Sequence, residues 1–564
     1  MLRLAPYLTA GLVAGPIAVG LLGVTLPAFG LLPGLGGDMA TLAPWFRLLD
    51  QPGLGRSVAV ALFAGLGSTL IAVLLVFLFL AAADGTRLLG WMRRLVAPLL
   101  AVPHAAAAVG VAFLIAPSGL LARLASPWAT GWQRPPDLLI VHDGWGLAMI
   151  AGLVAKEVPF LLLMCLAVLP SLDPTRRLAI ARSLGQPPFT AWLKAVAPGL
   201  YPLVRLPVFA VLAFACSTAD VALILGPTNP PPLAVAVLRW FADPDLSMRL
   251  VASAGALLQL LVSLAAMAAW WAGERVVAGL GRGWLTGGAP GVAGRAVSWL
   301  GLAGLPAVAM SLTVAILGLA VSSLAGPWRF PDALPDGLTL AVWARSLPAI
   351  AGGLATTLLL AALAAVLATV AVLAVLEQAA RRGRAADRAA GRALHGLLYL
   401  PLLLPQVPFV FGLVVGAETV GLAPGHGLVL VGHVVFVLPY VLLVLAEPYR
   451  RFDPRWIMLG ATLGASPART FWTVRLPILL GPCLAALAVG LAVSVGQYLP
   501  TLLLGAGRVE TVTTAAVALA SGGDRRVVGA WALAQAAVPA AGFALALLLP
   551  RLAWRRRRGL GAAR

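Results

Sequence analysis

Long apolar runs limit most strongly what this chain can fold into. A helix needs about 20 mainly apolar residues to cross the hydrocarbon core of a bilayer. Twelve stretches reach about this length, at residues 7–29, 57–83, 95–116, 144–169, 201–225, 249–272, 300–324, 350–376, 395–417, 427–446, 478–504 and 527–550. Lipid offers the backbone no hydrogen-bond partner, so such runs are expected to form helices. The sequence therefore predicts an all-α polytopic membrane protein with about 12 transmembrane helices.

The charged residues support this interpretation. Only 11% of the chain is charged, whereas about 25% is usual for soluble globular domains. This difference excludes a cytosolic enzyme and a disordered chain. The formal net charge of +20 would suit a nucleic-acid-binding protein, but the charges are nearly absent from the apolar runs. Their distribution points to lipid rather than nucleic acid as the partner of the chain.

The positions of the basic residues predict the orientation in the membrane. With the N-terminus placed inside, most of the 40 basic residues fall in the inner connections, among them Arg93-Arg94, Arg176-Arg177 and Arg555–Arg558. Short cytoplasmic connections of membrane proteins carry such an excess of Lys and Arg. We therefore expect both termini in the cytoplasm. The Arg-rich, Lys-poor composition suggests a bacterial chain, most simply placed in the inner membrane.

The chain contains an internal repeat. Five positions recur in the same order, so that Pro103, Gly110, Asp173, Gly185 and Pro198 return as Pro405, Gly412, Asp453, Gly464 and Pro477. Because each copy has six spans, the copies should share one orientation, as in a parallel repeat. We predict a first six-span repeat at 1–272, a cytoplasmic linker at 273–298 and a second six-span repeat at 299–564. A path between the two repeats is then expected.

Two predicted cytoplasmic connections, 173–198 and 453–477, have a regular pattern of their own. Each opens with Asp-Pro, where the aspartate can cap a helix and the proline fits its first turn. A glycine follows, Gly185 or Gly464, at which a helix can end in a left-handed turn. A second amphipathic segment then leads to a proline at the entry to the next span. The pattern predicts two helices joined by a glycine turn, lying along the membrane surface and available to a partner.

The spacing in these connections resembles the EAA loop of binding-protein-dependent ABC importer permeases. That motif reads Glu-Ala-Ala, three residues, Gly, nine residues, Ile, one residue, Leu-Pro. In the second copy nine residues separate Gly464 from Val474, and Leu-Pro follows after one more residue. In the first copy nine residues separate Gly185 from Ala195. The chain looks like the fused double permeases of thiamine and iron(III) importers, a resemblance that covers nearly its whole length.

The resemblance implies a type I ABC importer permease fold and a set of partners. The two loops would dock a separate ABC ATP-binding subunit, expected in two copies, and a periplasmic substrate-binding protein would select and deliver the cargo. The implied docking positions are Asp173, Gly185, Pro198, Asp453, Gly464, Leu476 and Pro477. Ala179 and Met458 stand where the family has glutamate, so no salt bridge from that glutamate to the ATPase is expected.

The chain itself has no sequence for hydrolysing ATP. A Walker A loop needs Gly-Lys followed by Ser or Thr, because the lysine and the backbone amides cradle the phosphates. The only two lysines, Lys156 and Lys194, follow alanine and leucine. No acid/base pair, nucleophile triad or metal-ligand pattern is present either. We therefore expect a transport subunit that is not an enzyme, holds no cofactor, and works with ATP hydrolysed by a partner.

Polar residues inside the spans are the candidates for a substrate path. They are Lys156 and Glu157 in the fourth span, Ser217 and Asp220 in the fifth, and Ser494 and Gln497 in the eleventh. Charges in the bilayer usually face a cavity or a partner. In the fifth and eleventh spans a spacing of three residues would place both side chains on nearly one helix face. A structural interpretation competes with the path, in which Asp220 pairs with Lys156 of the neighbouring span.

A second class of transporter shares the general layout. Major facilitators also have twelve spans in two halves, need no ATPase, and carry the signature Gly, three residues, Asp-Arg, one residue, Gly-Arg-Arg. The segment 383–392 has one residue too many before its second glycine, and the equivalent segment 84–94 does not match. The organised connections here also follow the fourth and tenth spans rather than the sixth. A secondary transporter of this type is the alternative hypothesis.

Overall fold

The computed structural model describes residues 2–32, 34, 37–287, 295–382 and 388–553. Within these residues the regular structure is helical, apart from two isolated β-bridges, Leu32–Gly37 and Ala325–Leu338. Ten of the described helices are long and apolar enough to cross a membrane, or twelve if each of two bent helix pairs counts as one span. The predicted all-α polytopic fold is confirmed.

The helices of the first half run from residue 2 to residue 286. They are η1 (Leu2–Leu4), α1 (Ala5–Ala28), α2 (Ala43–Leu49), α3 (Leu54–Ala83), α4 (Arg87–Ala101), α5 (His104–Ile115), α6 (Leu120–Ala125), α7 (Leu147–Val168), η3 (Leu169–Leu172), α8 (Pro174–Ser183), α9 (Pro188–Ala195), α10 (Ala197–Ser217), α11 (Asp220–Leu225), α12 (Leu233–Phe241) and α13 (Met248–Thr286). The long α1, α3, α7, α10 and α13 supply most of its membrane-crossing length.

Among the described residues, the second half repeats this order without counterparts of η1, α2, α6 and η3. Its helices are α14 (Arg295–Leu324), α15 (Ala341–Arg382), α16 (Arg388–Leu403), α17 (Gln406–Thr419), α18 (His426–Arg450), α19 (Arg455–Thr462), α20 (Pro467–Thr470), the π-helical η4 (Phe471–Arg475), α21 (Leu476–Ile478), α22 (Leu480–Val495), α23 (Leu499–Gly505), α24 (Val512–Ala520) and α25 (Arg525–Ala553). Thus α14 corresponds to α1, α15 to α3, and α25 to α13.

The first helix of each half packs against the other half. α1 lies along α17, and α14 lies along α3 and α5. Glycine makes the α1–α17 crossing possible, because a Cβ on Gly412 would lie 1.7 Å from the carbonyl oxygen of Gly20, and one on Gly23 2.0 Å from that of Gly412. Small residues let helix backbones approach in this way inside membranes. The two halves are therefore interlocked through their first helices.

Four predicted spans are wrong as single helices: 95–116, 201–225, 395–417 and 478–504. The structure breaks them at residues 102–103, 218–219, 404–405 and 496–498. Pro103 and Pro405 explain two breaks, because proline donates no backbone hydrogen bond and fixes φ. The bend between α16 and α17 reaches 100°. Hydropathy does not detect such breaks, because it measures transfer into lipid and not the direction of the chain.

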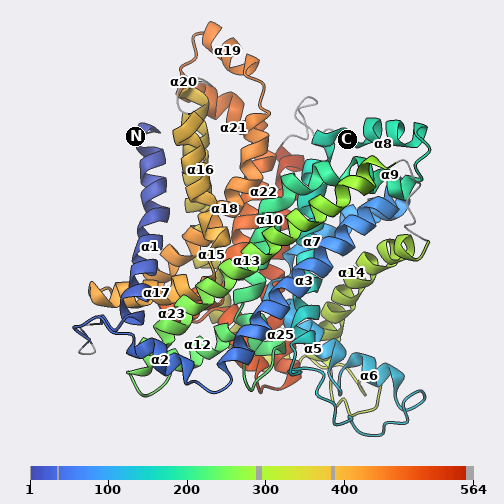
Figure 1. The fold of residues 1–564 in the computed structure, drawn as a ribbon, viewed down its shortest axis with the longest axis vertical. Helices are drawn as coiled ribbons and strands as arrows, with labels where there is room; N and C mark the ends of the chain where they lie inside the picture. The colour runs from blue at the N-terminus through green and yellow to red at the C-terminus, as the bar shows by residue number, and fades with distance from the viewer. Residues whose placement is uncertain (1, 33, 35–36, 288–294, 383–387, 554–564) are drawn as a thin grey trace.

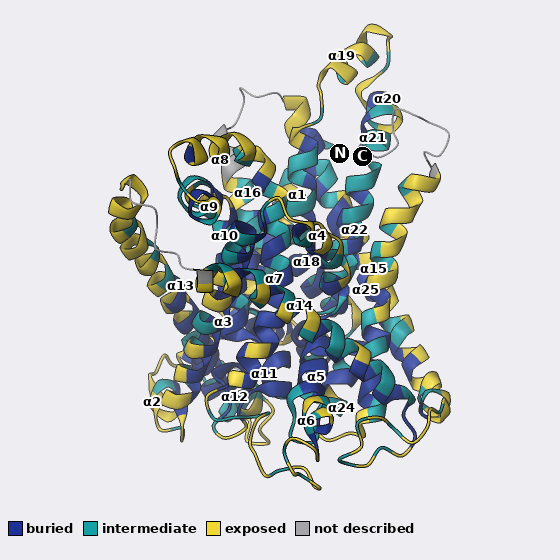
Figure 2. Cartoon of the chain, turned by 90° about the vertical axis from the view of Figure 1, so that its right-hand side faces the viewer, coloured by how far each residue is buried: buried dark blue, intermediate teal, exposed yellow. Residues whose placement is uncertain are grey.

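Helices that were predicted to be cytoplasmic lie together at one end of the molecule. Figures 1 and 2 show α8, α9 and α19–α21 at the same end as the start of α1, and α2, α6 and α12 at the opposite end. The predicted linker 273–298 is largely helical, since α13 continues to Thr286 and α14 begins at Arg295. The remainder of that linker at 288–294, the segment 383–387 and the arginines at 555–558 lie outside the described residues.

Candidate functional site

The first glycine-turn loop, residues 173–198, has the predicted helix–turn–helix form. α8 ends before Gly185, which has φ +80°, and α9 follows. The capping expectation is wrong for Asp173, because this residue itself adopts φ +46° and its side chain makes no cap hydrogen bond. Leu178 of α8 is buried, whereas Ile180 faces outward and is exposed. The loop thus has one face on the protein and an apolar face that is open.

In the second glycine-turn loop, residues 453–477, α19 projects beyond the ends of the neighbouring helices (Figure 1). Asp453 Oδ1 accepts a hydrogen bond of 2.9 Å from the backbone N–H of Arg455, the first residue of α19. Gly464 has φ +72°, and Ser466 then caps α20 by accepting from the backbone N–H of Arg469 at 3.3 Å. No residue of α19 is buried, as the exposed colouring of this helix in Figure 2 shows.

The outer face of α19 and its turn is strongly apolar. Four large hydrophobic side chains are exposed there: Trp456, Met458, Leu459 and Leu463. Ile180 and Leu184 hold a similar place on the first loop and are also exposed. Apolar groups gathered on an exposed, organised segment typically mark a surface that another protein covers. Both glycine-turn loops therefore present such a surface at the same end of the molecule.

The inner parts of the loops are attached to the membrane helices. In the first loop, Trp192 of α9 is almost fully buried and its ring lies edge-on to Phe77 of α3, with centroids 6.1 Å apart. Arg177 of α8 donates to the carbonyl oxygen of Ala195 at 3.2 Å, which joins α8 to the end of α9. Pro198 lies in the first turn of α10. A movement of α8 is therefore passed directly to helices in the membrane.

The corresponding end of the second loop enters the membrane through η4 and α21. Leu476 and Pro477 form the first turn of α21 and are half-buried. Arg475, one residue earlier, is buried and makes an ion pair with Glu377 near the end of α15. The sequence interpretation missed this pair. The only signal of this pair in the sequence is the arginine between Val474 and Leu476, because its partner Glu377 lies 98 residues away.

The helix break between α10 and α11 separates the two predicted path residues of the fifth span. The hydroxyl of Ser217 donates at 2.8 Å to the carbonyl oxygen of Ala213 on its own helix. Thr218 is extended, and its hydroxyl donates to Asp220 Oδ1 at 2.7 Å. The prediction that Ser217 and Asp220 share one helix face is therefore wrong. Thr218 is the residue that accompanies the Asp220 carboxylate.

The eleventh span contains a second buried polar cluster at its break. His433 of α18 lies between Ser494 and Thr501, with its Nδ1 2.7 Å from the serine hydroxyl and its Nε2 2.9 Å from the threonine hydroxyl. Gln497 donates from Nε2 to the carbonyl oxygen of His433 at 3.3 Å. Its Oε1 is buried and accepts no hydrogen bond from any described residue. This oxygen is thus free to accept from a solute or a water.

The residues at which the helices begin show which positions of the two polar clusters correspond, and this differs from the sequence prediction. α11 and α12 begin at Asp220 and Leu233, and α23 and α24 begin 279 residues later at Leu499 and Val512. This offset pairs Thr218 with Gln497, rather than Asp220 with Gln497. α11 packs against α24 of the other half. The helix that follows the break of the first half therefore contacts the second half.

The fourth span carries its two charges in different directions. Lys156 donates from Nζ to the carbonyl oxygens of Leu99 and Leu100 at 3.1 and 3.4 Å. These carbonyls belong to the last turn of α4, which lacks helical partners because α4 ends there. The proposed pairing of Lys156 with Asp220 is therefore wrong. A cation at this position also suits the negative end of the α4 dipole.

Glu157 points instead toward α3. Its Oε1 accepts a hydrogen bond of 3.2 Å from the hydroxyl of Ser68, whereas its buried Oε2 accepts none from the described residues. The side chain is almost fully enclosed among α3 and α7. The described residues contain no group of three or more His, Cys, Asp or Glu side chains that could hold a metal ion.

Known proteins resemble this chain over different lengths. The inner membrane ABC transporter permease protein YnjC of Escherichia coli (strain K12) is 31% identical over 534 residues, covering 92% of this chain and 93% of that protein. A spermidine/putrescine transport system permease protein PotC homolog of Mycoplasma genitalium is 30% identical over 110 residues, covering 20% and 37%. The molybdenum transport system permease protein ModB of Mycobacterium tuberculosis is 29% identical over 129 residues, covering 21% and 49%. No family model matches the chain.

Proposed function

Because this chain belongs to the ABC transporter permeases, we propose that it forms the translocation path of an ATP-driven importer and docks a separate ATPase through its two glycine-turn loops. A permease of this family is a transport subunit rather than an enzyme. The finer proposal adds the direction of transport, the docking surface and the residues of the path. It also adds the absence of a cofactor in this chain, with ATP bound and hydrolysed by the partner.

One observation carries the docking proposal. Both halves place a short exposed helix, a glycine with φ above +70° and an attached second helix at the same end of the molecule. The exposed apolar residues of α8 and α19 would lie in clefts of the ATP-binding subunits. Two equivalent loops fit two copies of that subunit, one on each half.

The opposite end of the molecule would receive a periplasmic substrate-binding protein. It carries α2, α6, α12 and α24. The charge pattern of the sequence supports an outer position for this end and cytoplasmic termini in a bacterium, with the helices in the inner membrane. Between the two ends, Thr218, Asp220 and Gln497 would line the path where the broken helices of the two halves meet. The cargo then passes from the binding protein to this meeting point.

Co-purification from the native membrane tests the proposal. We expect an ABC ATP-binding subunit to remain bound to the full-length chain in mild detergent, and ATP hydrolysis by the complex to depend on both proteins. Replacing Leu459 and Leu463 with serine should release the ATPase, because the exposed apolar face of α19 is then lost. Serine at Leu317 and Leu545, exposed side chains of α14 and α25, is the matched control. Uptake driven by an ion gradient without nucleotide would favour the major facilitator alternative instead.

A further inference from the structure

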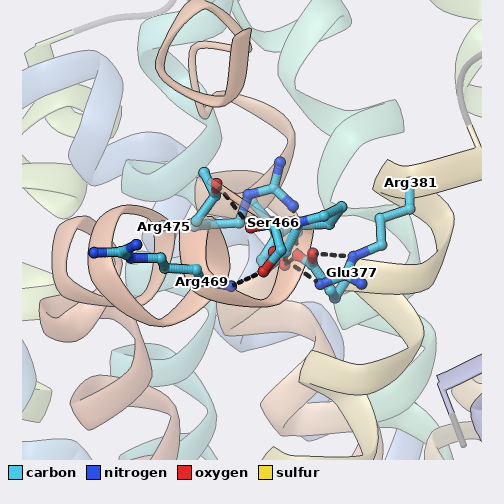
Figure 3. A network of polar contacts seen from close by, with 8 residues as sticks. Glu377, Arg381, Ser466, Arg469 and Arg475 are labelled. Atoms are coloured by element: carbon cyan, nitrogen blue, oxygen red, sulfur yellow. Dashed lines mark hydrogen bonds and ion pairs between the residues drawn. The ribbon is translucent and has the colours of Figure 1, made fainter. Parts of the chain in front are cut away.

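A buried ion pair joins the second glycine-turn loop to the membrane helices. The carboxylate of Glu377, near the end of α15, accepts hydrogen bonds from Arg475 of η4 and from the hydroxyl of Tyr449 at the end of α18. The Glu377 and Arg475 side chains are only 6% and 10% exposed. Figure 3 shows Glu377 between Arg381 and Arg475. With the hydrogen bond from Tyr449, three elements, α15, α18 and η4, meet at this carboxylate.

Further contacts extend this attachment along the loop. Arg381 donates from Nε to Glu377 Oε1 at 2.6 Å and from Nη2 to the carbonyl oxygen of Pro467 in α20 at 3.2 Å. The guanidinium of Arg475 also lies over the rings of Tyr449 and Phe452, 5.3 and 5.0 Å from their centroids. The segment that leads from α19 back to the membrane is therefore bound at Pro467 by Arg381 and at Arg475 by Glu377, Tyr449 and Phe452.

Among the described residues, the ion pair that the first loop makes with α3 is not buried. Asp84, just after α3, and Arg182 of α8 lie 3.9 Å apart, and their side chains are 32% and 50% exposed. Val196, which is fully buried, stands where the offset of 279 residues places Arg475. α15 has 42 residues and α3 has 30. The extra length of α15 at its loop end carries Glu377 and Arg381, for which α3 offers no counterpart.

These two attachments differ in strength for a physical reason. An exposed ion pair contributes little, because water screens both charges and the long side chains lose freedom. Separating a buried pair is strongly unfavourable, because each charge would be left without a partner in a medium of low dielectric constant. The buried pair therefore allows one arrangement of the second loop, whereas the first loop depends on the apolar packing of α9.

We propose that Glu377 and Arg475 are positioning residues that lock the second glycine-turn loop to α15 and α18. A displacement of α19 then moves these membrane helices with it through a buried ion pair, whereas the first loop is attached to α3 by the apolar packing of α9. The two loops therefore pass motion to the membrane helices through different kinds of contact. The proposal rests on the proposed function, since the displacing partner is the docked ATPase, but the lock itself is a property of this chain alone.

Hydrogen exchange of the full-length chain in lipid nanodiscs tests the lock without any partner. In Glu377→Gln and Arg475→Met, which remove a charge but keep the size, the amides of 471–479 should exchange about tenfold faster or more, because a buried charge loses its partner and the segment opens locally. The matched control is Asp84→Asn, for which exchange in 174–183 should change by less than about twofold. Exchange in 471–479 within about twofold of the unaltered chain in both variants would overturn the proposal.

Two milder variants keep the test decisive if a lone buried charge prevents folding. Tyr449→Phe leaves the ion pair intact, and Arg475→Lys keeps the charge but not the planar fork that holds a carboxylate. Each should accelerate exchange in 471–479 by more than about threefold, an intermediate effect because only part of the network is lost. No acceleration in either variant would contradict the lock as firmly as the first result.

A second readout distinguishes positioning from mere stabilisation. Spin labels on Thr462→Cys in α19 and Ala380→Cys in α15, without the native cysteines, report the distance between the two elements in the complex with the co-purified ATPase. With the lock intact, this distance should stay constant between the ATP-bound and nucleotide-free states, and in Glu377→Gln it should change. A constant distance in that variant would overturn the positioning role. Failure of any ATPase to bind would instead refute the proposed function and leave the exchange result standing.

Discussion

The glycine of the second glycine-turn loop offers the sharpest test of coupling. Gly464 has φ +72°, and a Cβ added to it would meet no atom within 4 Å. A substitution therefore meets no steric obstacle from neighbours, and its cost is the backbone conformation alone. For an L-residue in the left-handed region this cost is roughly 1–2 kcal/mol. β-branched residues tolerate the region even less well.

This cost predicts a graded loss of function. A penalty of roughly 1–2 kcal/mol lowers the population of the native turn relative to alternatives by a factor of about 5–30. Substrate-stimulated ATPase activity of the reconstituted complex should fall by a similar factor in Gly464→Ala and further in Gly464→Val. Membrane insertion and yield should not change, because the loop lies outside the membrane helices. The paired variant with Gly185→Val should be the least active.

A matched control separates the turn from general damage. Gly481 lies within α22, and a Cβ there also meets nothing within 4 Å. Alanine at this helical position should keep full activity and stabilise the helix by up to about 1 kcal/mol. Unchanged stimulation of the ATPase in the paired Gly185 and Gly464 variant would refute the role of both loops in coupling. Equal losses in the Gly481 control would refute the backbone explanation.

Three further predictions follow from the packing, the topology and the path. Gly412→Ala should lower the thermal unfolding temperature and the yield, because its Cβ would lie 1.7 Å from a backbone oxygen of α1. Overpacking of this kind costs about 1–3 kcal/mol or more. Gly11→Ala is the control and should have no such effect, because a Cβ at Gly11 faces open space. Cysteine at position 286 should react with an impermeant thiol reagent only after cells are permeabilised, and cysteine at position 130 from outside; equal behaviour would contradict the orientation. Cysteine at position 220 should be accessible from water in at least one nucleotide state, and protection in every state would exclude Asp220 from the path.

The number of spans and the ends of the loops were predictable because they depend on local properties. Transfer into lipid is roughly additive along a run of residues, so the apolar stretches could be counted. The left-handed turns at Gly185 and Gly464 were also predictable, since glycine adopts positive φ at little cost. Asp453 binds the backbone N–H of Arg455 as Asp-Pro indicated, but Asp173, in the same sequence pattern, does not. The Asp-Pro pattern is therefore compatible with a helix cap by the aspartate, but it does not ensure that the cap forms.

The candidate path was predicted only in part. The sequence pointed to polar residues that the structure buries next to two helix breaks, but it assumed continuous helices. The breaks before Asp220 and after Ser494 change which side chains meet, so that Thr218 accompanies Asp220 and His433 joins Ser494. Apolar composition continues through both breaks, and periodicity therefore could not reveal them.

The sequence by itself determined what depends on neighbouring residues: the membrane environment, the helical class, the repeated order and the two glycine turns. The tertiary structure alone decided which distant groups meet. Lys156 binds the end of α4 rather than Asp220, and Glu377 pairs with Arg475 across 98 residues. The glycines of α1 and α17 meet between the two halves. Such contacts depend on the packing of several helices at once, because a buried charge or a close backbone crossing is stable only where its partner arrives from elsewhere in the chain.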